Sequence, residues 1–182
     1  DRITISSVPG VGMKATESST IVGIALEDFD GNRAYSAGYL NQFGDDMVIG
    51  TRTGQAQVNI KDSELVFVGY GVDAPEQQWN DYAGIDVKGK TVVMLVNDPG
   101  FHANDARLFD GKRMTYYGRW TYKFEEAARK GAAAALIIHD TEGASYGWDV
   151  VKNSWSGPQY DLPAKDDPAP RVPAQGWITS EA

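Results

Sequence analysis

The histidines are the first residues to consider for hydrolytic or metal chemistry. The 182 residues contain two histidines, His102 and His139, and no cysteine. A zinc centre without thiolate ligands usually needs two or three converging imidazoles, and neither histidine lies in an H-E-x-x-H spacing. We therefore predict no metal ligand, no cofactor and no metal-dependent catalytic residue within this chain.

Ser145 offers a second possible chemistry, that of a serine nucleophile. It lies in Gly143-Ala-Ser-Tyr-Gly147, which matches the G-x-S-x-G elbow and follows a predicted buried strand. The elbow places serine directly at the strand-to-helix turn, whereas two residues intervene here, and no histidine follows Ser145. A convergent triad with His102 or His139 stays open, so a small serine hydrolase is one alternative function.

Two further motifs, one for dinucleotide binding and one for calcium binding, each lack a feature that the function requires. Gly69-Tyr-Gly-Val-Asp-Ala74 matches the dinucleotide fingerprint, but Pro75 and the polar residues after it form no helix that could hold a pyrophosphate. The aspartates in 28–32 lack the glutamate of a calcium loop, so we predict a turn between strands 20–26 and 33–40.

Aromatic residues crowd two segments of the chain. Tyr116, Tyr117 and Arg119 lie together, and Trp148 and Trp155 lie together after the second predicted buried strand. Aromatic side chains and arginine dominate the hot spots of binding interfaces, and a domain of this size cannot bury all of them. We therefore predict that these five residues contact a ligand or partner.

The first aromatic segment leads into the helix that must position it. Thr121 is the predicted N-cap of a helix over 121–130, with acidic residues in its first turns and basic residues in its last. Gly131 fits the left-handed residue that ends a helix, and the apolar run 132–138 is the predicted buried strand that follows.

This helix has one predicted apolar stripe, which we expect to pack on the core. The stripe consists of Trp120, Phe124, Ala127 and Ala128. The charged residues predicted to point away from it are Lys123, Glu126 and Lys130. Trp120, Phe124 and Gly131 are therefore predicted to be structural residues.

The remaining pattern predicts a β-rich α+β fold. Predicted strands are 46–51, 55–60, 64–70, 91–96 and 132–138. Strand 91–96, the helix and strand 132–138 form one right-handed βαβ unit, and the other strands look hairpin-like. We predict an open β barrel or sandwich with one main helix and short flanking helices, one of which covers 149–155.

Length and charge limit the possible partners. One domain is the simplest count, with 1–19 as an N-terminal flank, 20–162 as the domain and 163–182 as a proline-rich linker and C-terminal flank. The formal charge of −8 argues against nucleic-acid binding, and no apolar run is long enough for membrane insertion. Because the chain begins at Asp1 without an initiator methionine, we expect it to be a piece of a longer protein.

Several longer motifs resemble a known family. They are Leu65–Gly71, Ala74–Glu76 with Trp79–Gly84, Asp86–Val93, Asn97–Gly100 and, at greatest length, Met114–Lys130 continued to His139. Together they resemble the protease-associated (PA) domain inserted in bacterial zinc-dependent aminopeptidases, in the family that also includes glutamate carboxypeptidase and the transferrin receptor. The resemblance covers about 46–162 and is vaguer outside that range.

The resemblance implies a β-rich domain of an exported enzyme, extracellular or periplasmic. The parent enzyme would carry two zinc ions in a separate catalytic domain, whose ligand motifs have no counterpart in this chain. The implied role is accessory: shaping substrate access or mediating protein interactions. The implied partners are its own peptidase domain and that enzyme's peptide or protein substrate. An autonomous peptide- or glycan-binding module is a further alternative.

Overall fold

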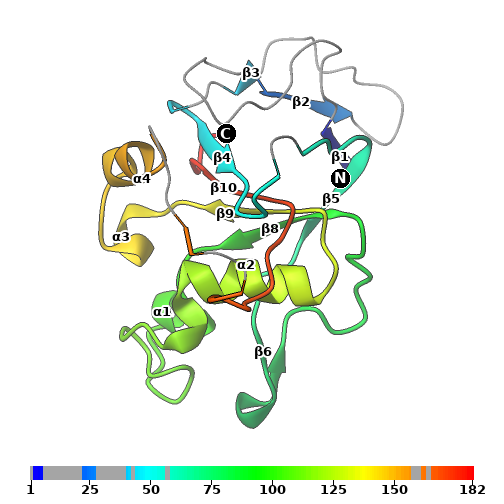
Figure 1. The fold of residues 1–182 in the computed structure, drawn as a ribbon. Helices are drawn as coiled ribbons and strands as arrows, with labels where there is room; N and C mark the ends of the chain where they lie inside the picture. The colour runs from blue at the N-terminus through cyan, green and yellow to red at the C-terminus, as the bar shows by residue number, and fades with distance from the viewer. Residues whose placement is uncertain are drawn as a thin grey trace.

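The computed structural model describes residues 2–5, 22–27, 40–41, 44–55, 58–156, 161–162 and 165–182. Within these ranges the core is an eight-stranded mixed sheet (Figure 1). Its strands in spatial order are β3 (Leu40–Asn41), β2 (Val22–Glu27), β1 (Arg2–Ile5), β5 (Ser63–Phe67), β8 (Thr91–Leu95), β9 (Ala134–Ile138), β10 (Ala174–Ile178) and β4 (Met47–Gly50).

The five strands from β5 to β4 form the largely parallel part of this sheet. The pairs β5–β8, β8–β9 and β9–β10 are parallel, and β10–β4 is antiparallel. The chain is therefore an α/β domain with a mixed sheet and a few helices. The predicted βαβ unit is confirmed, since Thr91 pairs with Ala134 and Leu95 with Ile138.

The hairpin-like pairing predicted for the other strands is wrong for the strand over 64–70, because β5 pairs with β8 in parallel. The connection from β5 to β8 contains no α-helix, only the small antiparallel hairpin of β6 (Asp73–Ala74) and β7 (Trp79–Asn80) around the 3-10 helix η1 (Pro75–Gln77). Parallel strands are usually joined by a helix. Because no α-helix lies between β5 and β8, the sequence shows no strand-helix-strand alternation that would indicate a parallel pair. The hairpin projects away from the sheet, at the bottom of Figure 1.

The sheet is strongly curled. Its two edge strands, β3 and β4, are separated in the chain by residues 42–46 alone. A chain spans at most about 3.6 Å per residue, so the edges lie within about 22 Å of each other. Antiparallel strands β1 and β2 join the edge strand β3 to the parallel part, as Figure 1 shows.

Short helices surround the parallel strands. They are α1 (Pro99–Ala103), the 3-10 helix η2 (Tyr116–Gly118), α2 (Trp120–Arg129), α3 (Thr141–Ala144) and α4 (Trp148–Ser154). The predicted helices 121–130 and 149–155 are confirmed to within one residue at each end. Helix α1 was not predicted, because a single turn begun by proline leaves no periodic apolar pattern.

Helix α2 corrects several predictions. Its N-cap is Arg119, which makes no side-chain capping bond, so Thr121 is not the cap. Trp120 is 41% exposed and is not a core residue, whereas Phe124 is 3% exposed, as predicted. Lys123 and Glu126 are buried, although the sequence placed them on solvent-facing sides.

The helix is buried on two sides, which explains these differences. One side, with Phe124 and Ala127, packs on the main core of the sheet. The other side presents Tyr122 to a second apolar cluster that includes Val72 and Phe109. A single-stripe interpretation accounts for only the first of these contacts.

Gly131 ends α2 as predicted. Its φ of +79° lies in the left-handed region, and its N–H donates to the carbonyl oxygen of Ala128 at 3.0 Å. Ala132 and Ala133 then lead into β9.

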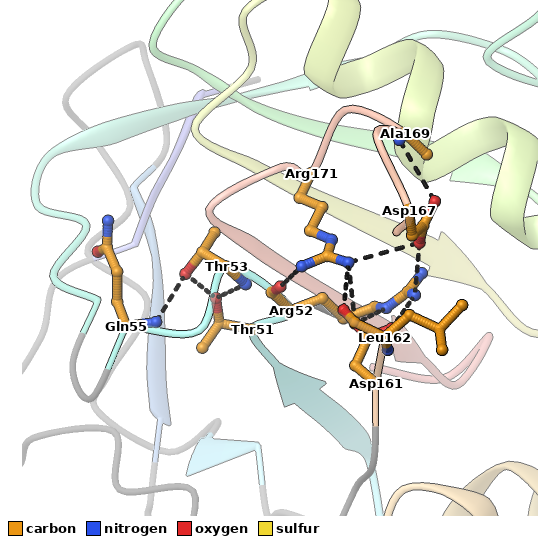
Figure 2. Close-up of polar contacts among 9 residues, drawn as sticks. All are labelled: Thr51, Arg52, Thr53, Gln55, Asp161, Leu162, Asp167, Ala169 and Arg171. Carbon is orange, nitrogen blue, oxygen red and sulfur yellow. Dashed lines mark hydrogen bonds and ion pairs between the residues drawn. The ribbon is translucent and has the colours of Figure 1, made fainter. Parts of the chain in front are cut away.

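Two arginines fasten the segment that leads into β10 (Figure 2). Arg52, just after β4, donates to both carboxylate oxygens of Asp161 at 2.6 and 2.7 Å. Arg171 donates to the carbonyl oxygens of Arg52 and Leu162, each at 3.0 Å. Strand β10 lies in the range 163–182 predicted as linker and flank, and it is an interior strand of the sheet.

Some predictions concern other parts of the chain. The predicted strand 20–26 corresponds to β2, but the turn 28–32 and strand 33–40 fall almost wholly outside the described residues. The described residues of 55–60 form no strand. Among the helices that the structure describes, none has the length and apolar character to cross a membrane.

Candidate functional site

Tyr116 is an exposed aromatic residue whose ring contacts two neighbouring tyrosine rings. It is 58% exposed, and its ring lies edge-on to those of Tyr117 and Tyr122, at centroid distances of 5.8 and 5.2 Å. The hydroxyl of Tyr117 donates a hydrogen bond to the exposed carboxylate of Glu76 in η1. We call Tyr116, Tyr117 and Glu76 the tyrosine surface.

The Glu76 carboxylate sets the electrostatics of this surface. It raises the pKa of Tyr117 to about 12, chiefly through the hydrogen bond, because losing the hydroxyl proton would place two negative charges together. No ion pair involves Glu76 in the part of the chain that the structure describes. The sequence placed Glu76 in a family-like motif but did not reveal its contact with Tyr117, because it precedes Tyr117 by 41 positions.

A buried aromatic cluster holds the tyrosine surface in place. Phe109 lies edge-on to Tyr117 at 5.7 Å and to Trp79 at 5.9 Å. The hydroxyl of Tyr122 accepts from the Asp73 N–H at 3.0 Å and lies 3.1 Å from the Asp73 carbonyl oxygen, to which it can donate. Helix α2, the hairpin around η1 and the loop carrying Phe109 are thereby joined.

The five predicted contact residues fall into two groups. Tyr116, Tyr117 and the exposed Arg119 lie together along η2 and the start of α2. Trp148 is half-buried and donates from its indole nitrogen to the carbonyl oxygen of Gly44 at 2.9 Å. Trp155 is also half-buried, with its ring 6.4 Å from that of Phe124.

Lys123 is a buried base that sequence reasoning missed. Its side chain is fully buried, and its Nζ donates to the carbonyl oxygen of Tyr70 in the loop after β5. Burial lowers the pKa of Lys123 to about 7, opposed by the charges of Asp81 and Asp98. The Asp81 carboxylate fixes the same loop by accepting from Tyr70 N at 3.1 Å.

Asp98 follows β8 at the carboxyl edge of the parallel strands. Its Oδ2 accepts from the backbone N–H and the hydroxyl of Thr115, both at 2.9 Å. Its Oδ1 is buried and has no hydrogen-bond partner among the described residues, and burial raises the pKa of the carboxyl group. These bonds hold the start of η2 against the sheet.

The histidines do not assemble a catalytic group with Ser145. His102 Nε2 lies 3.2 Å from Asp140 Oδ2, and His139 Nε2 donates to the carbonyl oxygen of Tyr146 at 2.9 Å. Ser145 ends α3 with a φ of +67°, whereas an elbow serine would begin the helix. Among the described residues, no hydrogen bond joins Ser145 to an imidazole, and no three His, Asp or Glu side chains form a metal-binding group.

Comparison with known proteins adds little to this geometry. No protein-family model and no curated protein matches the sequence. Among solved structures, the chain is similar to part of an aminopeptidase from Aneurinibacillus sp. strain AM-1, at 15% identity and a TM-score of 0.33. That match covers 99% of this chain and 24% of the aminopeptidase, so the chain spans about a quarter of its length. A likeness at this level establishes no family and no activity for this chain.

Proposed function

We propose that this chain is a PA-like accessory domain of an exported zinc aminopeptidase, with its curled sheet forming an open barrel. Its role is to shape substrate access or to bind other proteins, and the peptidase chemistry belongs to a separate catalytic domain. The donor set described above does not fit a two-zinc centre, because no three His, Asp or Glu side chains converge among the described residues.

One observation carries the proposal. The longest family-like motif, 114–139, places Tyr116 and Trp120 at the surface, where they are 58% and 41% exposed. Large aromatic side chains that a stable domain leaves exposed on rigid elements are typical of contact surfaces. Helix α2 and β9 supply that rigidity, since the helix packs on β9, the middle strand of the five from β5 to β4.

The isolated chain provides the first test. We expect no turnover of aminoacyl p-nitroanilides in the presence of zinc, beyond a control without protein. Robust turnover that copurifies with the chain and is lost on unfolding would contradict the proposal.

The peptidase translated from the complete reading frame provides the second test. Replacing Tyr116 with alanine there should raise KM for a long peptide substrate while leaving kcat/KM for an aminoacyl p-nitroanilide unchanged. Small substrates do not reach beyond the catalytic centre, so they serve as the internal control. Equal losses for both substrates would indicate a structural role instead.

An autonomous peptide- or glycan-binding module is the second candidate, favoured by the exposed indole of Trp120. Titration of the chain with oligosaccharides, followed through the Trp120 indole NMR signal, separates the two functions. Saturable shifts at Trp120 with a glycan would favour the second candidate. The indole of Trp148 is a suitable control, because its N–H is already bonded to Gly44.

A further inference from the structure

Glu76 differs from three acidic residues of neighbouring segments, each of which is paired with a cation of the same chain. These pairs are Asp73 with Lys130 at 2.5 Å, Glu126 with Arg129 at 2.6 Å and Asp110 with Arg113 at 3.2 Å. The exposed Glu76 carboxylate instead accepts from the Tyr117 hydroxyl, and no cation of the described residues pairs with it. One negative charge of this region is therefore free to meet a cation from outside.

The ring of Tyr116 is the neighbour of Tyr117, whose hydroxyl bonds that carboxylate, and its centroid lies 5.8 Å from that of Tyr117. Aromatic faces attract ammonium and guanidinium groups, and this chain already uses its rings in this way. The Arg129 guanidinium lies 5.7 Å from the Tyr122 ring centroid, and Lys130 Nζ lies 5.5 Å from that of Tyr82. The Tyr116 ring has no such cation among the described residues and is 58% exposed.

We propose that the tyrosine surface binds a basic peptide segment, with one lysine or arginine side chain over the Tyr116 ring and its charge beside the Glu76 carboxylate. The surface is preorganised, because Tyr117 is held edge-on between Phe109 and Tyr122 at 5.7 and 5.0 Å. The formal charge of −8 attracts basic partners over a longer range. This deepens the proposed accessory role by naming the chemistry of the partner, and it rests on that role only for its biological setting.

Arg119 favours an acidic partner instead of a basic one, so the two possibilities can be distinguished by experiment. It is exposed, it follows η2 directly, and it would repel a basic peptide but attract an acidic one. If the partner is basic, the binding energy comes from Glu76 and Tyr116. If the partner is acidic, it comes from Arg119.

The experiment is an NMR titration of the 182-residue chain, with the tyrosine ring signals assigned. The probes are the peptides Gly-Arg-Gly-Arg-Gly and Gly-Glu-Gly-Glu-Gly, both acetylated and amidated so that their termini carry no charge. We expect saturable shifts at Tyr116 and Tyr117 with the arginine peptide, weakening as NaCl is raised, and no saturation with the glutamate peptide.

Single substitutions test which side chains contribute to binding of the arginine peptide. Glu76→Gln and Tyr116→Leu should each raise the Kd of the arginine peptide roughly two- to five-fold, because exposed cation–π contacts and surface ion pairs contribute about 0.5–1 kcal/mol. Glu181→Gln removes one charge from another exposed glutamate and should leave the Kd unchanged. In Glu76→Gln the Tyr117 hydroxyl can still donate to the side-chain amide oxygen, so the fold is preserved.

Three outcomes would overturn the inference. They are no saturable shift with the arginine peptide, equal effects of Glu76→Gln and Glu181→Gln, or tighter binding of the glutamate peptide that is lost in Arg119→Ala. None of these measurements uses peptidase activity, so they leave the accessory role to its own tests.

Discussion

The ammonium group of Lys123 lies inside the protein, where its Nζ donates to the carbonyl oxygen of Tyr70. Asp81 and Asp98 favour its charge, but burial outweighs them and lowers the pKa to about 7. Lysine in the unfolded chain titrates near 10.5. The folded protein therefore holds a lysine that loses its proton around neutral pH, while the unfolded chain keeps that proton.

This difference predicts a pH-dependent stability. Between pH 7 and about 10 the unfolded chain binds more protons at Lys123 than the folded chain, so the free energy of unfolding rises with pH, by at most about 1.4 kcal/mol per unit. Below pH 7 both states are charged, and the cost of burying the ammonium is present in full. Lys123→Met should abolish the rise, as measured by urea unfolding at pH 7, 8 and 9.

Lys88→Met is the matched control, because Lys88 is exposed. It should retain the rise in stability from pH 7 to 9. The same slope in Lys123→Met as in the unmodified chain would show that Lys123 is not the group responsible.

Truncating two aromatic residues of α2 should lower the free energy of unfolding by different amounts. Phe124 is 3% exposed and packs in the main core, so Phe124→Ala should lower the free energy of unfolding by about 3–5 kcal/mol. Trp120 is 41% exposed, so Trp120→Ala should cost about 1 kcal/mol. Urea midpoints at constant m-value measure both, and an equal loss would mean that Trp120 packs in the core after all.

At the scale of the element, α2 shows what sequence could and could not predict. Its C-terminal limit follows from local chemistry, since Gly131 was recognised because a left-handed C-terminal residue favours glycine. The burial of Lys123 and Glu126 was missed, because the apolar pattern shows one packed face and the second cluster comes from distant segments. The same reason explains why Trp120 was taken for a core residue.

Gly131 carries the prediction at this scale. Its φ is +79°, so Gly131→Ala should cost about 1–2 kcal/mol of unfolding free energy through backbone strain. A Cβ there would meet Lys88 Cγ at 3.5 Å, which is an ordinary contact. A Cβ at Gly50 would meet the Trp155 ring at the same 3.5 Å without a positive φ, so Gly50→Ala is the control and should be nearly neutral. Equal costs in urea unfolding would point to crowding instead of strain.

At the scale of the molecule, the sequence predicted local units better than their assembly. The β8-α2-β9 unit was predictable because buried strands and an amphipathic helix follow one another in the chain. The parallel neighbour β5 was not, since no α-helix lies between it and β8. Strand β10 was not, since it lies in the range taken for linker and flank, and only the short helices α3 and α4 are described between it and β9. The tyrosine surface was half predicted: Tyr116 and Tyr117 stand out locally, whereas Glu76 joins them only through the tertiary fold.

The segment before β10 is held by Arg171, which bonds residues far away in the sequence. The side chain of Arg171 is 14% exposed, and it bonds the carbonyl oxygens of Arg52 and Leu162 and the carboxylate of Asp167 (Figure 2). Lysine keeps the charge but cannot reach these acceptors in the same fork geometry. Arg171→Lys should therefore lower the free energy of unfolding by about 1–3 kcal/mol.

The loss of stability in Arg171→Lys should be greatest near β10. Because β10 lies between β9 and β4, loosening its entry should speed amide hydrogen exchange in β10 and β4 before it affects β5 and β8. Arg107→Lys is the control, since Arg107 is 90% exposed and its partner Asp105 is two residues away. Comparable effects of the two variants would mean that the Arg171 contacts contribute no more than a surface ion pair, and that β10 is held by its strand pairing alone.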